Sequence, residues 1–138
     1  MNIESKQVVA QTSPEKLYNF LSDFNNFSRI IPQGQIQGWQ STADRCSFSI
    51  GGYMQISLAY LERTPYSRIV VGPAADASSP MPFKMEINLQ NNGGEGTKIT
   101  VGMNLEGGNP MMNMMLKPKL REAADKLAEQ LQYFGSAL

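Results

Sequence analysis

The 138-residue chain contains no histidine, and this absence limits the chemistry that it could perform. A Ser-His-Asp triad, a Cys-His dyad and a histidine-ligated metal are all excluded. Acid–base catalysis would fall to carboxylate, lysine or tyrosine side chains with shifted pKa values. Glu86 is predicted on a solvated strand face, and Glu62, in phase with Tyr60, ends a strand where a surface ion pair is expected. We therefore assign no catalytic residue, no metal site and no cofactor, and expect a binding protein rather than an enzyme.

Cys46 is the single cysteine, so it can form neither an intrachain disulfide nor a thiolate metal site alone. It alternates with Phe48 and Ile50 in a strand pattern. We predict that Cys46 is a small buried hydrophobe and not a nucleophile.

Methionine is abundant, with nine residues in the chain. Its flexible, polarisable side chain suits a surface that must fit varied apolar shapes. One group of methionines shares a helix face, and another falls on the predicted dry faces of three strands. Both groups could line an adaptable pocket near its mouth, and the alternatives are core filling or an exposed dimer patch. These residues are Met54, Met85, Met103, Met111, Met114 and Met115.

Five aromatic residues are candidates for the wall of such a pocket, since ligand pockets are mostly apolar with a few placed polar groups. They are Phe24, Phe27, Trp39, Phe48 and Tyr60. Ordinary core packing is the alternative, above all for Phe24 and Phe48. Tyr60 differs from the others because its hydroxyl needs a partner when buried and could orient the polar end of a ligand.

Residues 3–12 have the pattern of a strand, and Ser13-Pro14-Glu15 then supplies an N-cap, a first-turn proline and an acidic residue for a helix. A second short helix is predicted from Phe24 until Pro32 stops it. From Gln35 the apolar residues recur with period two, which indicates an antiparallel sheet with one dry face. The expected strands cover residues 36–41, 45–50, 53–62, 66–71, 83–89 and 97–105.

A closing helix is predicted over residues 111–134. At about 1.5 Å per residue it would be some 35 Å long and would cross a whole small sheet. Pro118 lies inside it and should kink or restart the helix near Lys117.

Composition narrows the class of protein further. Formal net charge is zero and no basic stripe exists, so nucleic-acid binding is disfavoured. No apolar run approaches the roughly 20 residues that span a bilayer, and the N-terminus lacks the apolar core of a signal peptide. We expect one cytoplasmic domain over residues 1–138, without stable membrane insertion.

Several motifs, taken in order, resemble a known superfamily. The segment Thr12-Ser13-Pro14-Glu15-Lys16-Leu17-Tyr18-Asn19-Phe20-Leu21 is similar to the entry of the START-like, or SRPBCC, superfamily into its first helix. Asp23-Phe24 and Ile31-Pro32 resemble the ending of its helix pair. The exit at Asn109-Pro110 and the amphipathic stretch from Leu120 to Phe134 resemble its closing helix.

The resemblance implies a START-like domain with the α+β helix-grip fold. In it, a curved antiparallel sheet of about six or seven strands wraps around a long C-terminal helix, with two short helices after the first strand. It also implies a cavity between sheet and helix for a lipid, polyketide or quinone-like molecule. It transfers no shared catalytic set. The alternatives are a cyclase/dehydrase-type enzyme that uses a cavity carboxylate or tyrosine, and an interaction module that uses the methionine patch, as in a homodimer.

Overall fold

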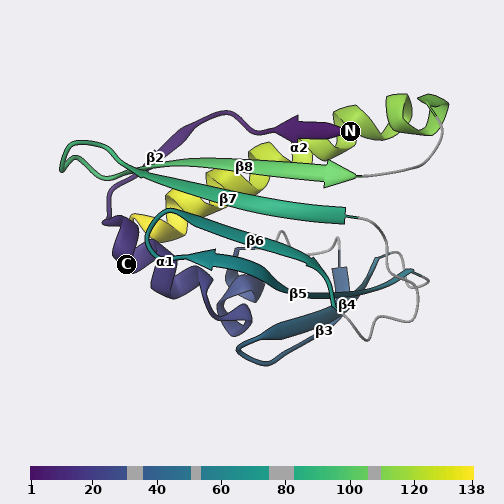
Figure 1. Ribbon diagram of the computed structural model, residues 1–138, viewed down its shortest axis with the longest axis horizontal. Helices are drawn as coiled ribbons and strands as arrows, with labels where there is room; N and C mark the ends of the chain where they lie inside the picture. The colour runs from purple at the N-terminus through teal and green to yellow at the C-terminus, as the bar shows by residue number, and fades with distance from the viewer. Residues whose placement is uncertain (31–35, 51–53, 75–82, 106–109) are drawn as a thin grey trace.

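The computed structural model describes residues 1–30, 36–50, 54–74, 83–105 and 110–138. An eight-stranded antiparallel sheet curves around one long helix, with two short helices at one end of the strands (Figure 1). The strands are β1 (Asn2–Glu4), β2 (Val8–Ala10), β3 (Ile36–Ser41), β4 (Arg45–Ile50), β5 (Met54–Thr64), β6 (Arg68–Pro73), β7 (Phe83–Asn91) and β8 (Thr97–Leu105). The helices are α1 (Pro14–Leu21), the 3-10 helix η1 (Phe24–Arg29) and α2 (Pro110–Gly135).

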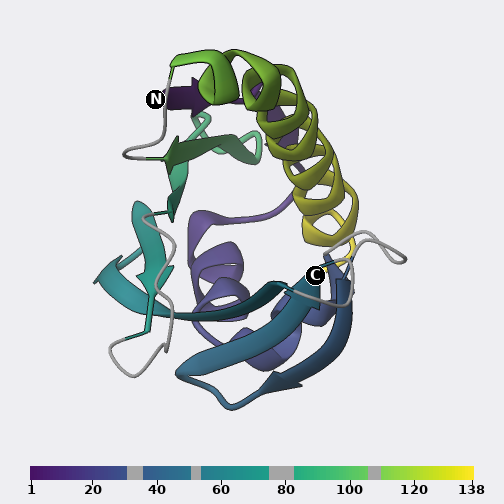
Figure 2. The same ribbon diagram turned by 90° about the vertical axis from the view of Figure 1, so that its right-hand side faces the viewer.

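The sheet follows the order β1-β8-β7-β6-β5-β4-β3, and β2 also pairs with β8. Every pairing is antiparallel, which matches the period-two pattern of the sequence. The predicted α+β helix-grip architecture is confirmed. The face that turns toward α2 is called the inner face below, and the opposite one the outer face (Figure 2).

The expected first strand is broken into β1 and β2, which is why the sheet has eight strands. The break lies at Ser5, which is buried. Its N–H donates to the Val101 carbonyl at 2.8 Å, and its Oγ accepts from the Val101 N–H at 2.9 Å. Because a side-chain oxygen replaces a main-chain carbonyl here, the regular strand ladder stops and resumes at Val8.

The two short helices after the first strands are confirmed. Ser13 caps α1, since its Oγ accepts from the Lys16 N–H at 3.2 Å. Asp23 caps η1 by accepting from the Asn25 N–H at 2.9 Å. The predicted stop at Pro32 lies outside the described residues.

A bulge in β5 corrects one expectation about phase. Tyr60 pairs with Val71, but Glu62 pairs with Val70, so one extra residue lies between the two pairs. A bulge shifts the alternation by one residue. The sequence pattern had put Glu62 in phase with Tyr60, but because of the bulge Glu62 lies on the outer face.

The helix α2 runs continuously through Pro118, so it does not restart at Lys117, and the alternative that Pro118 kinks the helix stays a prediction. Its closest neighbours in the sheet are β8, β2 and β1. Asp125 Oδ1 accepts from the Lys6 N–H at 2.8 Å, and the Gln132 side chain donates to the Val9 carbonyl at 2.9 Å. Within the described part of the chain, no helix has the length and apolarity needed to cross a bilayer.

Gly96, in the turn between β7 and β8, should be intolerant of a side chain. Its φ is +98°, and a Cβ would lie 2.3 Å from the Ala10 carbonyl oxygen in β2. Gly93 in the same turn has φ +64° but open space around it. We expect Gly96→Ala to cost roughly 3 kcal/mol of unfolding free energy and Gly93→Ala about 1 kcal/mol, measured by urea denaturation. Equal losses of unfolding free energy in the two variants would contradict the close contact between Gly96 and β2.

Candidate functional site

Aromatic side chains from β5 and η1 meet on the inner face. The ring of Phe24 stacks on that of Tyr60 with centroids 4.3 Å apart, and Phe27 lies 5.0 Å from Phe24. Phe24 and Phe27 are buried, while Tyr60 is partly buried. These rings close the end of the inner face that α1 and η1 cover.

The Tyr60 hydroxyl already has a protein partner. It donates to the Leu21 carbonyl at the end of α1, with 2.5 Å between the oxygens. Burial raises the pKa of the phenol, so Tyr60 stays neutral at physiological pH. The Arg63 guanidinium lies 4.6 Å from the ring centroid, outside the apolar cluster. Tyr60 thus joins β5 to α1, and its proton is committed to that bond.

Trp39 and Phe48 form a second aromatic pair, on β3 and β4. Their rings stack with centroids 5.6 Å apart. The Trp39 Nε1–H donates to Ser41 Oγ at 3.1 Å, and Ser41 in turn donates to Asn25 Oδ1 of η1 at 2.6 Å. Phe48 is buried, but Trp39 is only partly so. These two hydrogen bonds hold the indole ring at the edge of the inner face.

Packing of the inner face loosens toward the start of α2. Along β8 the exposed fraction rises from 0% at Ile99 to 8% at Met103, and along α2 from 1% at Leu131 to 7% at Leu127. Leu120, about two turns nearer the start of α2, is only partly buried. Most of the inner face is buried, and its cover is a little less complete near the start of α2, called the loosely packed end below, than at α1.

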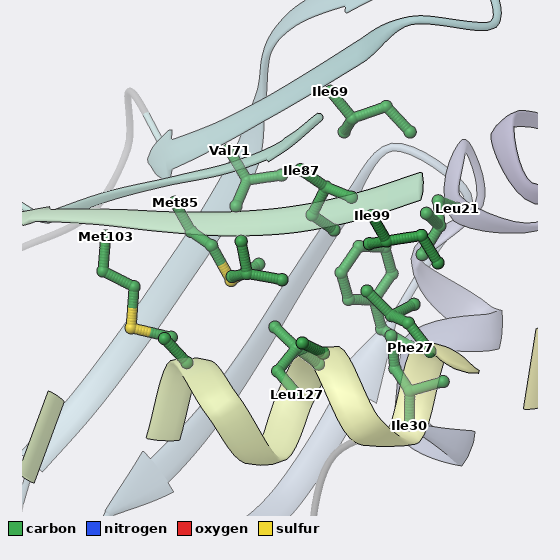
Figure 3. Packing of buried hydrophobic residues seen from close by; sticks show 14 of the residues in the cluster. Leu21, Phe27, Ile30, Ile69, Val71, Met85, Ile87, Ile99, Met103 and Leu127 are labelled. Atoms are coloured by element: carbon green, nitrogen blue, oxygen red, sulfur yellow. The ribbon is translucent and has the colours of Figure 1, made fainter. Parts of the chain in front are cut away.

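Two methionines lie side by side on neighbouring strands at the loosely packed end. Met85 pairs with Met103 in the register of β7 and β8. Both side chains point from the sheet toward α2 (Figure 3). The structure thus brings together the predicted inner-face methionines that it describes.

The helix methionines lie elsewhere. Met111, Met114 and Met115 are 75%, 76% and 69% exposed, on the side of α2 that faces solvent. They do not join the inner-face cluster, and a part in ligand binding stays a prediction for them. The side chain of Met54 lies outside the described residues.

The ionisable groups give little support to catalysis. Glu86 and Glu62 both face outward and flank Arg68, with N–O distances of 2.6 Å and 3.7 Å. Burial raises the pKa of the Cys46 thiol from 9.0 to about 12. Among the described residues, no group of three acidic or cysteine side chains is placed to hold a metal ion.

A hollow of about 640 Å³ lies on the outer face, and no motif in the sequence indicated it. The Arg68 ion pairs with Glu62 and Glu86 cross it, and Lys84 and Glu4 extend its polar lining. It lies across the sheet from the aromatic pairs and is open to solvent. Sequence reasoning also missed Ser41 and Asn25 as the residues that position Trp39, because that contact spans 16 positions.

Removal of the Tyr60 hydroxyl should weaken the fold. In Tyr60→Phe the Leu21 carbonyl loses its donor, and we expect a loss of about 1–3 kcal/mol in unfolding free energy. Tyr133→Phe is the matched control, since Tyr133 is an exposed tyrosine on α2. Chemical denaturation of both variants measures the difference. A Tyr60→Phe variant as stable as the control would show that the bond contributes nothing.

Cys46 should resist thiol reagents in the folded protein. A pKa of about 12 leaves almost no thiolate at pH 8, and the sulfur is buried. We expect reaction with a disulfide reagent such as DTNB to be at least about a hundred-fold slower than in the chain unfolded in guanidinium. Rapid stoichiometric labelling of the native protein would contradict the buried placement.

No protein-family model and no curated protein sequence matches the chain. Several solved structures, in contrast, resemble the chain over nearly its whole length. A START superfamily protein from Mycobacterium smegmatis superposes with a TM-score of 0.73 at 16% identity, covering 99% of this chain and 97% of the other. The KanY protein gives 0.75 at 12% identity, over 97% and 96% of the two chains. The Aha1 dimer from Colwellia psychrerythraea gives 0.61 at 17% identity, over 100% and 96%. The chain has the START-like, or SRPBCC, helix-grip fold.

Proposed function

We infer that the chain binds an apolar small molecule between the inner face of the sheet and the first half of α2. The observation that carries this proposal is the loosely packed end of the inner face. There, Met85 and Met103 are 8% exposed and Leu120 is only partly buried, whereas Leu17, Leu21 and Phe24 at the α1 end are 0–1% exposed. The solved neighbours include a START superfamily protein, which supports a small-molecule binder of this fold.

The chemistry of this surface suits a lipid, polyketide or quinone-like ligand. Methionine side chains adapt to varied shapes, and the Trp39–Phe48 pair offers a flat aromatic wall. Burial of about 300 Å² of apolar ligand surface would contribute roughly 7 kcal/mol before the cost of association. A carrier of this kind would act as one START-like domain in the cytoplasm.

The alternative enzyme of the cyclase/dehydrase type has weaker support. It requires a proton donor or acceptor near the ligand, but the Tyr60 proton is committed to the Leu21 carbonyl. Glu62 and Glu86 lie on the outer face, where Arg68 pairs with both. Binding without chemical conversion is therefore the function that we propose.

Filling the loosely packed end should abolish binding. In the double variant Met85→Phe/Met103→Phe, bulkier rings occupy the space between the sheet and α2, and we expect at least about a ten-fold weaker affinity for N-phenyl-1-naphthylamine. Thr100→Phe is the matched control, on the outer side of the same strand as Met103. The fluorescence of the probe and of Trp39, the single tryptophan, reports binding.

Thermal unfolding should first show that both variants remain folded. Equal binding by the wild type, the double variant and the control would place the probe elsewhere on the protein. A wild-type chain that binds neither this probe nor a long-chain fatty acid would refute the proposal.

A further inference from the structure

The first turns of α2 present an apolar stripe to solvent. At 100° per residue, Met111, Met114, Met115 and Pro118 fall on one side of the helix. That side is opposite to Leu127, which packs against the sheet. These residues, called the Met face below, are all exposed. Adjacent exposed apolar side chains of this size mark a surface that contacts something else.

Cations flank the Met face on both sides. Helical spacing places Lys117 and Arg121 along one edge and Lys119 along the other, and all three are exposed. The sequence has no acidic residue from position 107 to position 121. Glu122 follows, but its carboxylate is paired with Lys126 at 3.0 Å. A chain of zero net charge has thus gathered positive charge around one apolar stripe.

The Met face lies beside one end of the inner face. The first turns of α2 extend past the end of β8 (Figure 1). This is the loosely packed end of the inner face, where Met103 is 8% exposed and Leu120 is only partly buried. The apolar stripe and the incompletely packed interior therefore adjoin each other.

We propose that the Met face docks the protein on an anionic lipid surface. Apolar side chains with flanking lysine and arginine are the features of a helix that lies in a membrane interface. Anionic headgroups complement the three cations, and the thioether side chains enter the acyl boundary. The purpose that we assign to this contact, exchange of an apolar ligand with the membrane, rests on the function proposed above.

A second copy of the chain fits the Met face less well. A two-fold contact would bring the same surface of both copies together. It would set Lys117, Lys119 and Arg121 near their equivalents, and the nearby carboxylate of α2, that of Glu122, is already paired with Lys126. Like charges across an interface are strongly unfavourable. The charge pattern therefore favours a lipid surface over a homodimer.

Sedimentation with vesicles tests the proposal. The wild type should bind vesicles of phosphatidylcholine with phosphatidylglycerol, bind pure phosphatidylcholine weakly, and dissociate at about 0.5 M salt. Lys117→Gln/Lys119→Gln/Arg121→Gln should lower the partition coefficient about a hundred-fold. Met111→Gln/Met114→Gln/Met115→Gln should lower it at least about ten-fold. Glutamine is a good helix former, so α2 should persist, and circular dichroism checks this.

The matched control removes three other cations. Lys16→Gln/Lys84→Gln/Lys98→Gln makes the same change in net charge on α1, β7 and β8, and should keep vesicle binding within about two-fold. An equal loss in this control would show that only net charge matters and would overturn the proposal. So would a wild type that ignores anionic vesicles, or one that forms a dimer that the methionine variant disrupts.

The two proposals fail separately. Binding of N-phenyl-1-naphthylamine without vesicle binding would overturn membrane docking and leave the apolar site intact. Vesicle binding without any apolar ligand would confirm the docking surface and refute the function assigned to it. The cation variant should bind the naphthylamine probe as the wild type does, since its three positions lie outside the inner face.

Discussion

One helix is too narrow to cover the apolar inner face of this sheet. With its side chains an α-helix is about 10–12 Å wide, and neighbouring strands lie about 4.8 Å apart, so a helix spans two or three strands. Accordingly α2 lies closest to β8, β2 and β1. The remaining strands need another cover, because exposed apolar surface is costly. The helix pair α1 and η1 supplies it at one end of the sheet only.

This unequal cover divides the interior into two regions. At the α1 end, branched and aromatic side chains pack tightly, and the Tyr60–Leu21 bond fastens the sheet to the helix pair. At the other end the side chains include Met85 and Met103, and methionine adapts to a changing neighbour without a fixed shape. An adaptable end next to a rigid one suits the apolar ligand that we propose.

The strands and helices were largely predictable because each depends on local pattern. Alternation placed β4 and β8 at their observed bounds, and Ser13 with Pro14 marked the start of α1. The errors arose where a distant contact overrides the local pattern. Ser5 breaks the first strand because it bonds to Val101, and the β5 bulge moves Glu62 to the outer face.

The sequence alone determined the fold class, the buried cysteine and the lack of imidazole chemistry, because composition and periodicity depend on neighbours along the chain. Only the tertiary structure decided which apolar residues share a surface. It placed Met85 and Met103 against α2 and turned Met111, Met114 and Met115 toward solvent, although all five are equally apolar. The direction in which a side chain faces depends on where its element docks, and docking is set by contacts between residues far apart in sequence.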